Sequence, residues 1–145
     1  MASFPNIWRP RPGRFGNAVE VISQSLGTQG VTVANGTVVL VPSPRRRFYI
    51  ESIHILGTVA ATATSATFKV QRRDSAGAAD VDLTAATSLT SSVITGANTN
   101  AAVAISATQK QRQCNPGDLL KIVLATNTLT VQPTCQICIE IGFLD

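Results

Sequence analysis

The sequence is poor in the residues on which most catalytic and metal sites depend. Its 145 residues include one histidine, one tyrosine, one tryptophan and three cysteines, and only 14% of them are charged. Soluble domains usually carry about 25% charged residues. The lone histidine, His54, lies in a strand-like stretch, where a packed or hydrogen-bonded role is commoner than a catalytic one. No nucleophile elbow, zinc-protease motif or phosphate-binding glycine loop occurs. We therefore expect neither an enzyme nor a bound cofactor or metal.

Long apolar runs are missing as well. No stretch of about 20 uncharged apolar residues occurs, so no membrane span is expected. The first 30 residues contain three prolines and three arginines, and they lack the apolar core of a secretory signal. Three cysteines cannot all pair within one chain, which fits a reducing compartment.

Cys135 and Cys138 form a C-x-x-C pair inside a strand-like stretch. In a strand, a separation of three residues puts the two thiols on opposite faces. No second pair or nearby histidine completes a zinc site. We therefore expect these cysteines, and Cys114, to be ordinary buried or half-buried thiols.

What the chain has in abundance is β-branched residues. Valine, isoleucine and threonine account for 42 of the 145 residues, and such side chains favour strands over helices. Turn residues separate the apolar stretches at intervals of about 8–12 residues, without helical patterns between them. The sequence predicts an all-β fold, an antiparallel β-sandwich or jelly roll, in residues 31–145, preceded by an extended N-terminal arm and connector in residues 1–30.

The strand predictions differ in strength along the chain. The clearest patterns cover residues 37–41, 47–56, 66–72, 119–125 and 135–143. Weaker strand patterns cover residues 81–83, 92–95 and 101–106. In this region a helical turn at residues 84–89 is an alternative. In the longest strand the apolar phase switches between Ile50 and Ile53, which predicts a β-bulge. Residues 74–77 and 115–118 carry turn chemistry.

Residues 1–17 form a separate block of composition, in which prolines favour extended backbone. A segment this short cannot bury its aromatic side chains locally, so these need a surface to pack on. The arm either folds back on its own domain or docks on a neighbouring subunit or another protein. Residues 18–30 fit a short helix or a strand and are assigned to the connector. The candidate partner-binding residues of the arm are Phe4, Trp8, Arg9, Arg11, Arg14 and Phe15.

The positive charge is concentrated near the N-terminus. The formal net charge is +4, and residues 1–47 hold six arginines against one glutamate. The densest cluster, Arg45-Arg46-Arg47, precedes a strand, where it is open to three interpretations. These are salt bridges to a partner subunit or shell, plain solvation, and nucleic-acid binding with Phe48 and Tyr49 as stacking platforms. The nearly neutral body offers no wide basic face, so no specific nucleic acid is expected.

Four aspartates are candidates for a functional or turn-capping role. Asp74, Asp80 and Asp82 cluster within nine positions, as in a calcium loop or an acid pair, but the spacing does not match the EF-hand template. A solvated loop is the preferred interpretation. Asp118 follows Pro-Gly and is expected to cap a turn.

An aromatic, proline-rich arm followed by a Thr/Ala/Val-rich β-domain resembles the head decoration (cement) proteins of tailed double-stranded DNA bacteriophages. The stretches FYIESIHILGT, ATFKVQRRDSAG and NPGDLLKIVLAT are similar to phage virion β-sandwich modules. The resemblance implies a structural protein made in the host cytoplasm and bound to the major capsid protein on the capsid exterior. It also implies a homotrimer that reinforces contacts between capsomers. The alternatives are a receptor-binding or fibre/tail-associated β-module of a phage virion and a cellular oligomeric binding protein of the jelly-roll type.

Overall fold

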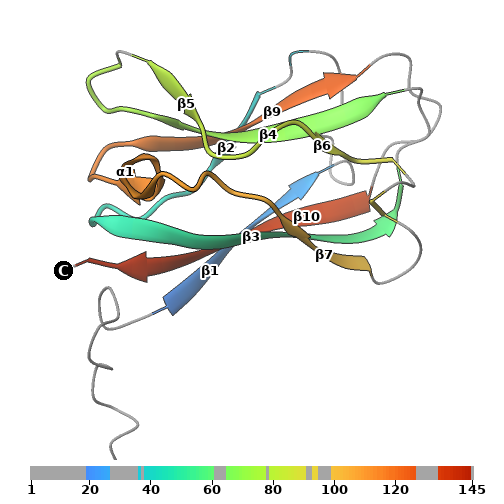
Figure 1. Ribbon diagram of the computed structural model, residues 1–145, viewed down its shortest axis with the longest axis horizontal. Helices are drawn as coiled ribbons and strands as arrows, with labels where there is room; N and C mark the ends of the chain where they lie inside the picture. Colours follow the sequence, from blue (N-terminus) through green and yellow to red (C-terminus); the bar gives the residue numbers. More distant parts are fainter. Residues whose placement is uncertain are drawn as a thin grey trace, which may run out of the picture.

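The computed structural model describes residues 19–26, 36, 38–60, 65–77, 79–90, 93–94, 99–126 and 134–144. These residues form two antiparallel sheets that pack face to face (Figure 1). The predicted arm, residues 1–17, lies outside the described residues. The all-β sandwich that the sequence predicts is confirmed for the body.

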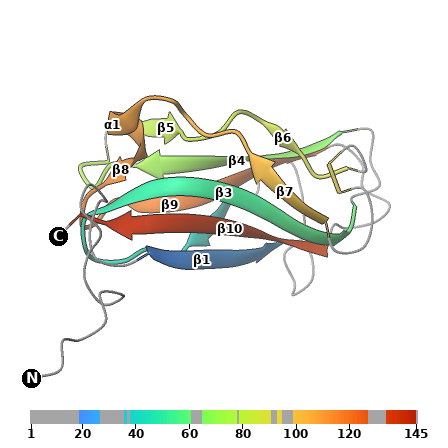
Figure 2. The same cartoon turned by 60° about the horizontal axis from the view of Figure 1, so that its bottom comes forward.

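The first sheet, sheet A, has the order β1-β10-β3-β7, and β8 pairs with the start of β3. Figure 2 shows β1 at one edge of this sheet, beside β10. The strands are β1 (Val19–Leu26), β3 (Phe48–Val59), β7 (Thr99–Val103), β8 (Gln113–Cys114) and β10 (Thr134–Phe143).

The second sheet, sheet B, has the order β2-β9-β4-β5, and β6 pairs with the start of β4. Its strands are β2 (Val38–Val41), β4 (Ala66–Arg73), β5 (Asp80–Asp82), β6 (Thr87–Ser88) and β9 (Leu119–Thr126). One helical turn, α1 (Gln109–Arg112), precedes β8.

The connectivity of the described strands is that of a jelly roll. β5 and β6 both lie along β4, while β7 and β8 both lie along β3, so each pair acts as one interrupted strand. Apart from the β4–β5 hairpin, each link between these strand positions crosses from one sheet to the other. Eight strand positions wound in this way make the double Greek key of a jelly roll.

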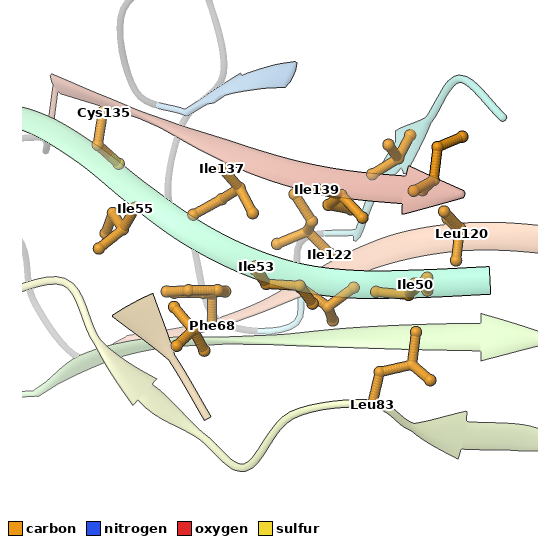
Figure 3. Packing of buried hydrophobic residues seen from close by; sticks show 14 of the residues in the cluster. Ile50, Ile53, Ile55, Phe68, Leu83, Leu120, Ile122, Cys135, Ile137 and Ile139 are labelled. Carbon is orange, nitrogen blue, oxygen red and sulfur yellow. The ribbon is translucent and has the colours of Figure 1, made fainter. Parts of the chain in front are cut away.

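The core follows from period-2 alternation, which sends every second side chain between the sheets. Ile137, Ile139 and Ile141 of β10 are fully buried, and Phe68 and Val70 of β4 meet them from the opposite sheet. Figure 3 shows Ile137, Ile139 and Phe68 of this set in the space between the two layers. The outward positions of β4 and β10 are half-buried or exposed, as the sequence pattern predicts.

The predicted bulge in β3 is confirmed. Ile50 pairs with Ile141 while Ser52 pairs with Glu140, so Glu51 is an extra residue on β3. The insertion flips the phase of the strand, and this allows Ile50, at 0% exposure, and Ile53, at 1%, both to face the core.

Both predicted turns are present. In residues 74–77 the Gly77 N–H donates to the Asp74 carbonyl at 2.8 Å, and in residues 115–118 the Asp118 N–H donates to the Asn115 carbonyl at 3.1 Å. Gly77 and Gly117 have φ values of +74° and +91°, a region that costs glycine little and other residues more.

Three expectations need correction. Val19–Leu26 is not part of a connector but strand β1, which pairs along its whole length with β10. No strand forms at Val93 and Ile94, whose N–H groups both donate to the Thr90 carbonyl at 3.0 Å in a turn. The helical turn considered at 84–89 is strand β6 at Thr87–Ser88, whereas the helix of the described chain is α1, which propensity did not indicate.

Candidate functional site

The residues that the structure describes do not bring the candidate metal ligands together. They contain no group of three or more histidine, cysteine, aspartate or glutamate side chains that could hold a metal ion. His54 is half-buried on the outer face of β3, opposite Cys138 on β10 and Ala102 on β7. No helix in the described part of the chain is long and apolar enough to cross a membrane.

The aspartates of the 74–82 region act as partners for cations and for backbone groups. Asp82 accepts hydrogen bonds from Gln71 at 2.6 Å and from Lys69 at 2.9 Å. The bonds from Gln71 and then Lys69 lower the pKa of the Asp82 carboxyl. Asp80 pairs with Lys121 at 2.7 Å, and Asp74 accepts from the Ala76 N–H at 2.7 Å. These contacts belong to an exposed charged surface over β4 and β5, as the solvated interpretation expects.

Asp118 is buried and joins two turns. Its carboxylate accepts from the Asn115 N–H at 2.9 Å within its own turn and from the Ser75 N–H at 3.0 Å in the other turn. The Arg72 guanidinium lies 3.8 Å away and also donates to the Gln113 carbonyl. The predicted capping role is confirmed, and it extends to a second turn that the sequence does not indicate.

The three thiols are free, and Cys135 and Cys138 lie on opposite faces of β10. Burial raises the pKa of Cys114 and of Cys135 to about 12. Burial also raises the pKa of Cys138, which is only half-buried. A C-x-x-C pair divided between the core and the outer surface cannot act as a dithiol.

Basic side chains gather at one end of the sandwich, around the start of β3 and helix α1. Arg46 stacks over the ring of Phe143, with 4.4 Å from its guanidinium carbon to the ring centroid, and Arg112 stacks over Tyr49 at 4.6 Å. Between them is a depression of about 430 Å³. It is lined by Arg47, Tyr49, Gln109, Lys110, Gln113 and Leu144. We call this region the basic end, defined by Arg45, Arg46, Arg47, Lys110 and Arg112.

The geometry of the basic end bears on one of the three interpretations of the arginine triplet, nucleic-acid binding. Phe48 is 1% exposed and faces the core, and Tyr49 is 8% exposed beneath Arg112. Neither ring offers a free face to a nucleic-acid base, so the stacking interpretation is not supported. Sequence reasoning missed Lys110 and Arg112, because α1 reaches the triplet only through the pairing of β8 with the start of β3.

A second surface, the outer face of sheet A, has a different character. Its depression of about 230 Å³ spans four strands and is mainly apolar. The lining residues are Val21, His54, Leu56, Asn100, Cys138 and Glu140. No short motif could indicate it, because its residues come together only through the register of β1, β10, β3 and β7.

The candidate arm residues Phe4, Trp8, Arg9, Arg11, Arg14 and Phe15 lie outside the described residues, so their role in partner binding stays a prediction.

No family model matches this sequence, and no curated protein matches it. A solved chain that is similar comes from the structure of the infectious bursal disease virus Gx strain, with 12% sequence identity and a TM-score of 0.43. The match covers 87% of this chain and 32% of the viral chain. The chain therefore spans about a third of the length of that protein chain.

Proposed function

We propose that this protein is a structural virion protein of the decoration type. In this role its basic end binds an acidic surface of the major capsid protein on the outside of the shell. The body then reinforces contacts between capsomers as part of a homotrimer. The observation that carries the proposal is the basic end, where Arg47 and Lys110 line one depression and Arg45, Arg46 and Arg112 are their close neighbours in the chain.

The way the arginines are held supports a binding role. Arg46 lies on Phe143 and Arg112 lies on Tyr49, so both guanidinium groups are positioned before any partner arrives. Positioned side chains lose less conformational entropy on binding than free ones. Arginine also suits planar, bidentate pairing with carboxylates on a protein partner.

The test is co-sedimentation with capsids that lack this protein. Reversing the charge of the triplet (Arg45→Glu, Arg46→Glu and Arg47→Glu together) should reduce attachment by roughly tenfold or more, because like charges then face each other. Lys69→Glu reverses an exposed charge in the middle of β4 on sheet B and serves as the control. Attachment of wild-type protein should also weaken as salt rises. Full occupancy by the triple variant, with its melting temperature unchanged, would rule out this docking surface.

The second candidate function is a receptor-binding or fibre/tail-associated module of a virion. The depression at the basic end favours it, because Gln109, Lys110 and Gln113 line a space able to accept an acidic glycan. Electron microscopy of virions that carry a labelled copy separates the two functions. Label on the head supports decoration, and label confined to the tail or fibres supports receptor binding.

A further inference from the structure

The two sheets differ in the sign of their charge. The strands of sheet A carry three glutamates, Glu20, Glu51 and Glu140, and no lysine or arginine. The strands of sheet B carry four cationic residues against two aspartates, which lie in ion pairs with Lys69 and Lys121. Sheet A is therefore the acidic layer of the sandwich.

The outer face of sheet A also exposes apolar side chains. Val21 on the edge strand β1 is 65% exposed, and Leu56 on β3 is 39% exposed. Both line the depression of about 230 Å³, together with the half-buried Cys138. An edge strand of eight residues without lysine or proline, as β1 is, lacks the usual protection against pairing with other chains. A face of this kind fits an apolar partner segment with positive charge.

Residues 1–17 have that chemistry. They contain three arginines and no acidic residue, and three aromatic residues are interleaved with them. The described chain begins at Val19, on the edge of the same sheet. The described chain therefore begins beside an acidic, apolar face, and residues 1–17, which precede it, carry the complementary charge.

We propose that residues 1–17 of one copy of the chain dock on the outer face of sheet A of a second copy. The aromatic side chains of the arm fill the depression around Val21, Leu56 and Cys138. Its arginines pair with Glu51 of β3 and Glu140 of β10.

The length of the arm favours docking on a second copy over docking on its own sheet. Seventeen extended residues span about 55–60 Å, whereas the four strands of sheet A are only about 15 Å across. The depression begins at Val21, two residues from the start of the described chain. A proline-rich segment favours extended backbone, and a segment of this length is long enough to reach a neighbouring copy. This proposal is independent of the virion role, because the exchange takes place between purified copies.

The experiment uses two full-length charge-reversal variants. The arm variant carries Arg9→Glu, Arg11→Glu and Arg14→Glu, and the face variant carries Glu51→Lys and Glu140→Lys. Each variant alone sets like charges against each other, so self-association measured by sedimentation should weaken by roughly tenfold or more. In an equimolar mixture, every arm meets an oppositely charged face only on the other variant. In a ring of three copies, two of the three arm contacts then join opposite charges, so association in the mixture should be clearly stronger than in either variant alone.

A second readout is the reaction of Cys138 with a thiol reagent at pH 8. Cys114 and Cys135 are buried, so Cys138 is the thiol that reports on the depression. Its labelling should be slow in the wild type, several-fold faster in each variant alone, and slower in the mixture than in either variant alone. Lys69→Glu should leave both readouts unchanged.

The outcomes are distinct. Recovery in the mixture supports exchange of arms between copies. A mixture as dissociated as its components, or a wild-type protein that remains monomeric at high concentration, overturns the proposal. Loss of capsid attachment with the exchange intact would concern the basic end alone, so failure of the proposed function can be told from failure of this inference.

Discussion

Asp118 shows how a single residue joins parts of the chain that are distant in sequence. Its buried carboxylate accepts N–H groups from both turns and lies against Arg72. Removing a buried carboxylate leaves its hydrogen-bond donors and its cationic partner without an acceptor. The cost of leaving these groups unpaired is the main way in which such a carboxylate affects stability.

We expect Asp118→Ala to lower the free energy of unfolding by about 3 kcal/mol, because two part-buried N–H groups and one guanidinium lose their acceptor. Asp74→Ala is the matched control, since Asp74 is exposed and caps its turn with one hydrogen bond. That variant should cost about 1 kcal/mol or less. Urea unfolding measures both, and equal losses would contradict the joining role of Asp118.

The buried thiols make stability sensitive to alkaline pH. Burial raises the pKa of Cys114 and of Cys135 from 9.0 to about 12, so the folded state retains two protons that the unfolded state loses above pH 9. Since the unfolded state then binds fewer protons, stability falls as pH rises from about 9 to 12, by up to about 1.4 kcal/mol per pH unit for each thiol.

Denaturant unfolding at several pH values measures this slope. Cys114→Ala removes one of the two thiols, so it should make the slope shallower even if it lowers stability overall. Lysine and tyrosine titration is common to both proteins and cancels in the comparison. An unchanged slope in the variant would assign the alkaline sensitivity to those other groups.

At the scale of elements, the bulge in β3 decides which side chains reach the core. Because Glu51 is an extra residue, Ile50 pairs with Ile141 while Ile53 and Ile55 still face inward. Without it, every position on one side of the bulge would move to the opposite face of the sheet.

Deletion of Glu51 should therefore leave the protein unfolded or aggregated at 25 °C. Turning Ile53 and Ile55 outward forfeits about 3–6 kcal/mol of burial, which is comparable to the whole stability of a small domain. Glu51→Ala retains the register and should change stability by about 1 kcal/mol or less. Circular dichroism and soluble yield distinguish the two variants, and a stable deletion variant would show that β3 can slip without cost.

The edge strand β1 is the element that sequence patterns described least well. Its alternation is weak because β1 lies at the edge of its sheet, and among the β1 side chains that the structure describes, Ile22 alone packs against the core. An edge strand is held by its backbone pairing with one neighbouring strand. In β1 all eight residues pair with β10. That pairing depends on the partner strand and leaves little trace in the local sequence.

At the scale of the whole molecule, the distribution of charge matters more than its sum. The formal net charge is +4, yet the strands of sheet A hold only acidic charges, while cationic residues gather at the basic end and in residues 1–17. Opposite charges on separate surfaces of one chain favour ordered association of copies over non-specific aggregation. Both proposed contacts, at the basic end and on sheet A, use this separation.

The sequence by itself determined the class of fold, the main strands, the bulge and the two turns. Each of these rests on local physics, namely side-chain alternation, β-branching, and the backbone angles of glycine and proline. Only the tertiary structure decided which strands are neighbours, because the crossings between sheets bring together segments far apart in the chain. Those crossings place Asp118 between two turns and Val21 beside Leu56, and the pairing of β8 with β3 places α1 beside the arginine triplet. The two candidate surfaces exist for that reason alone, since each is assembled from several strands whose register no single stretch of sequence encodes.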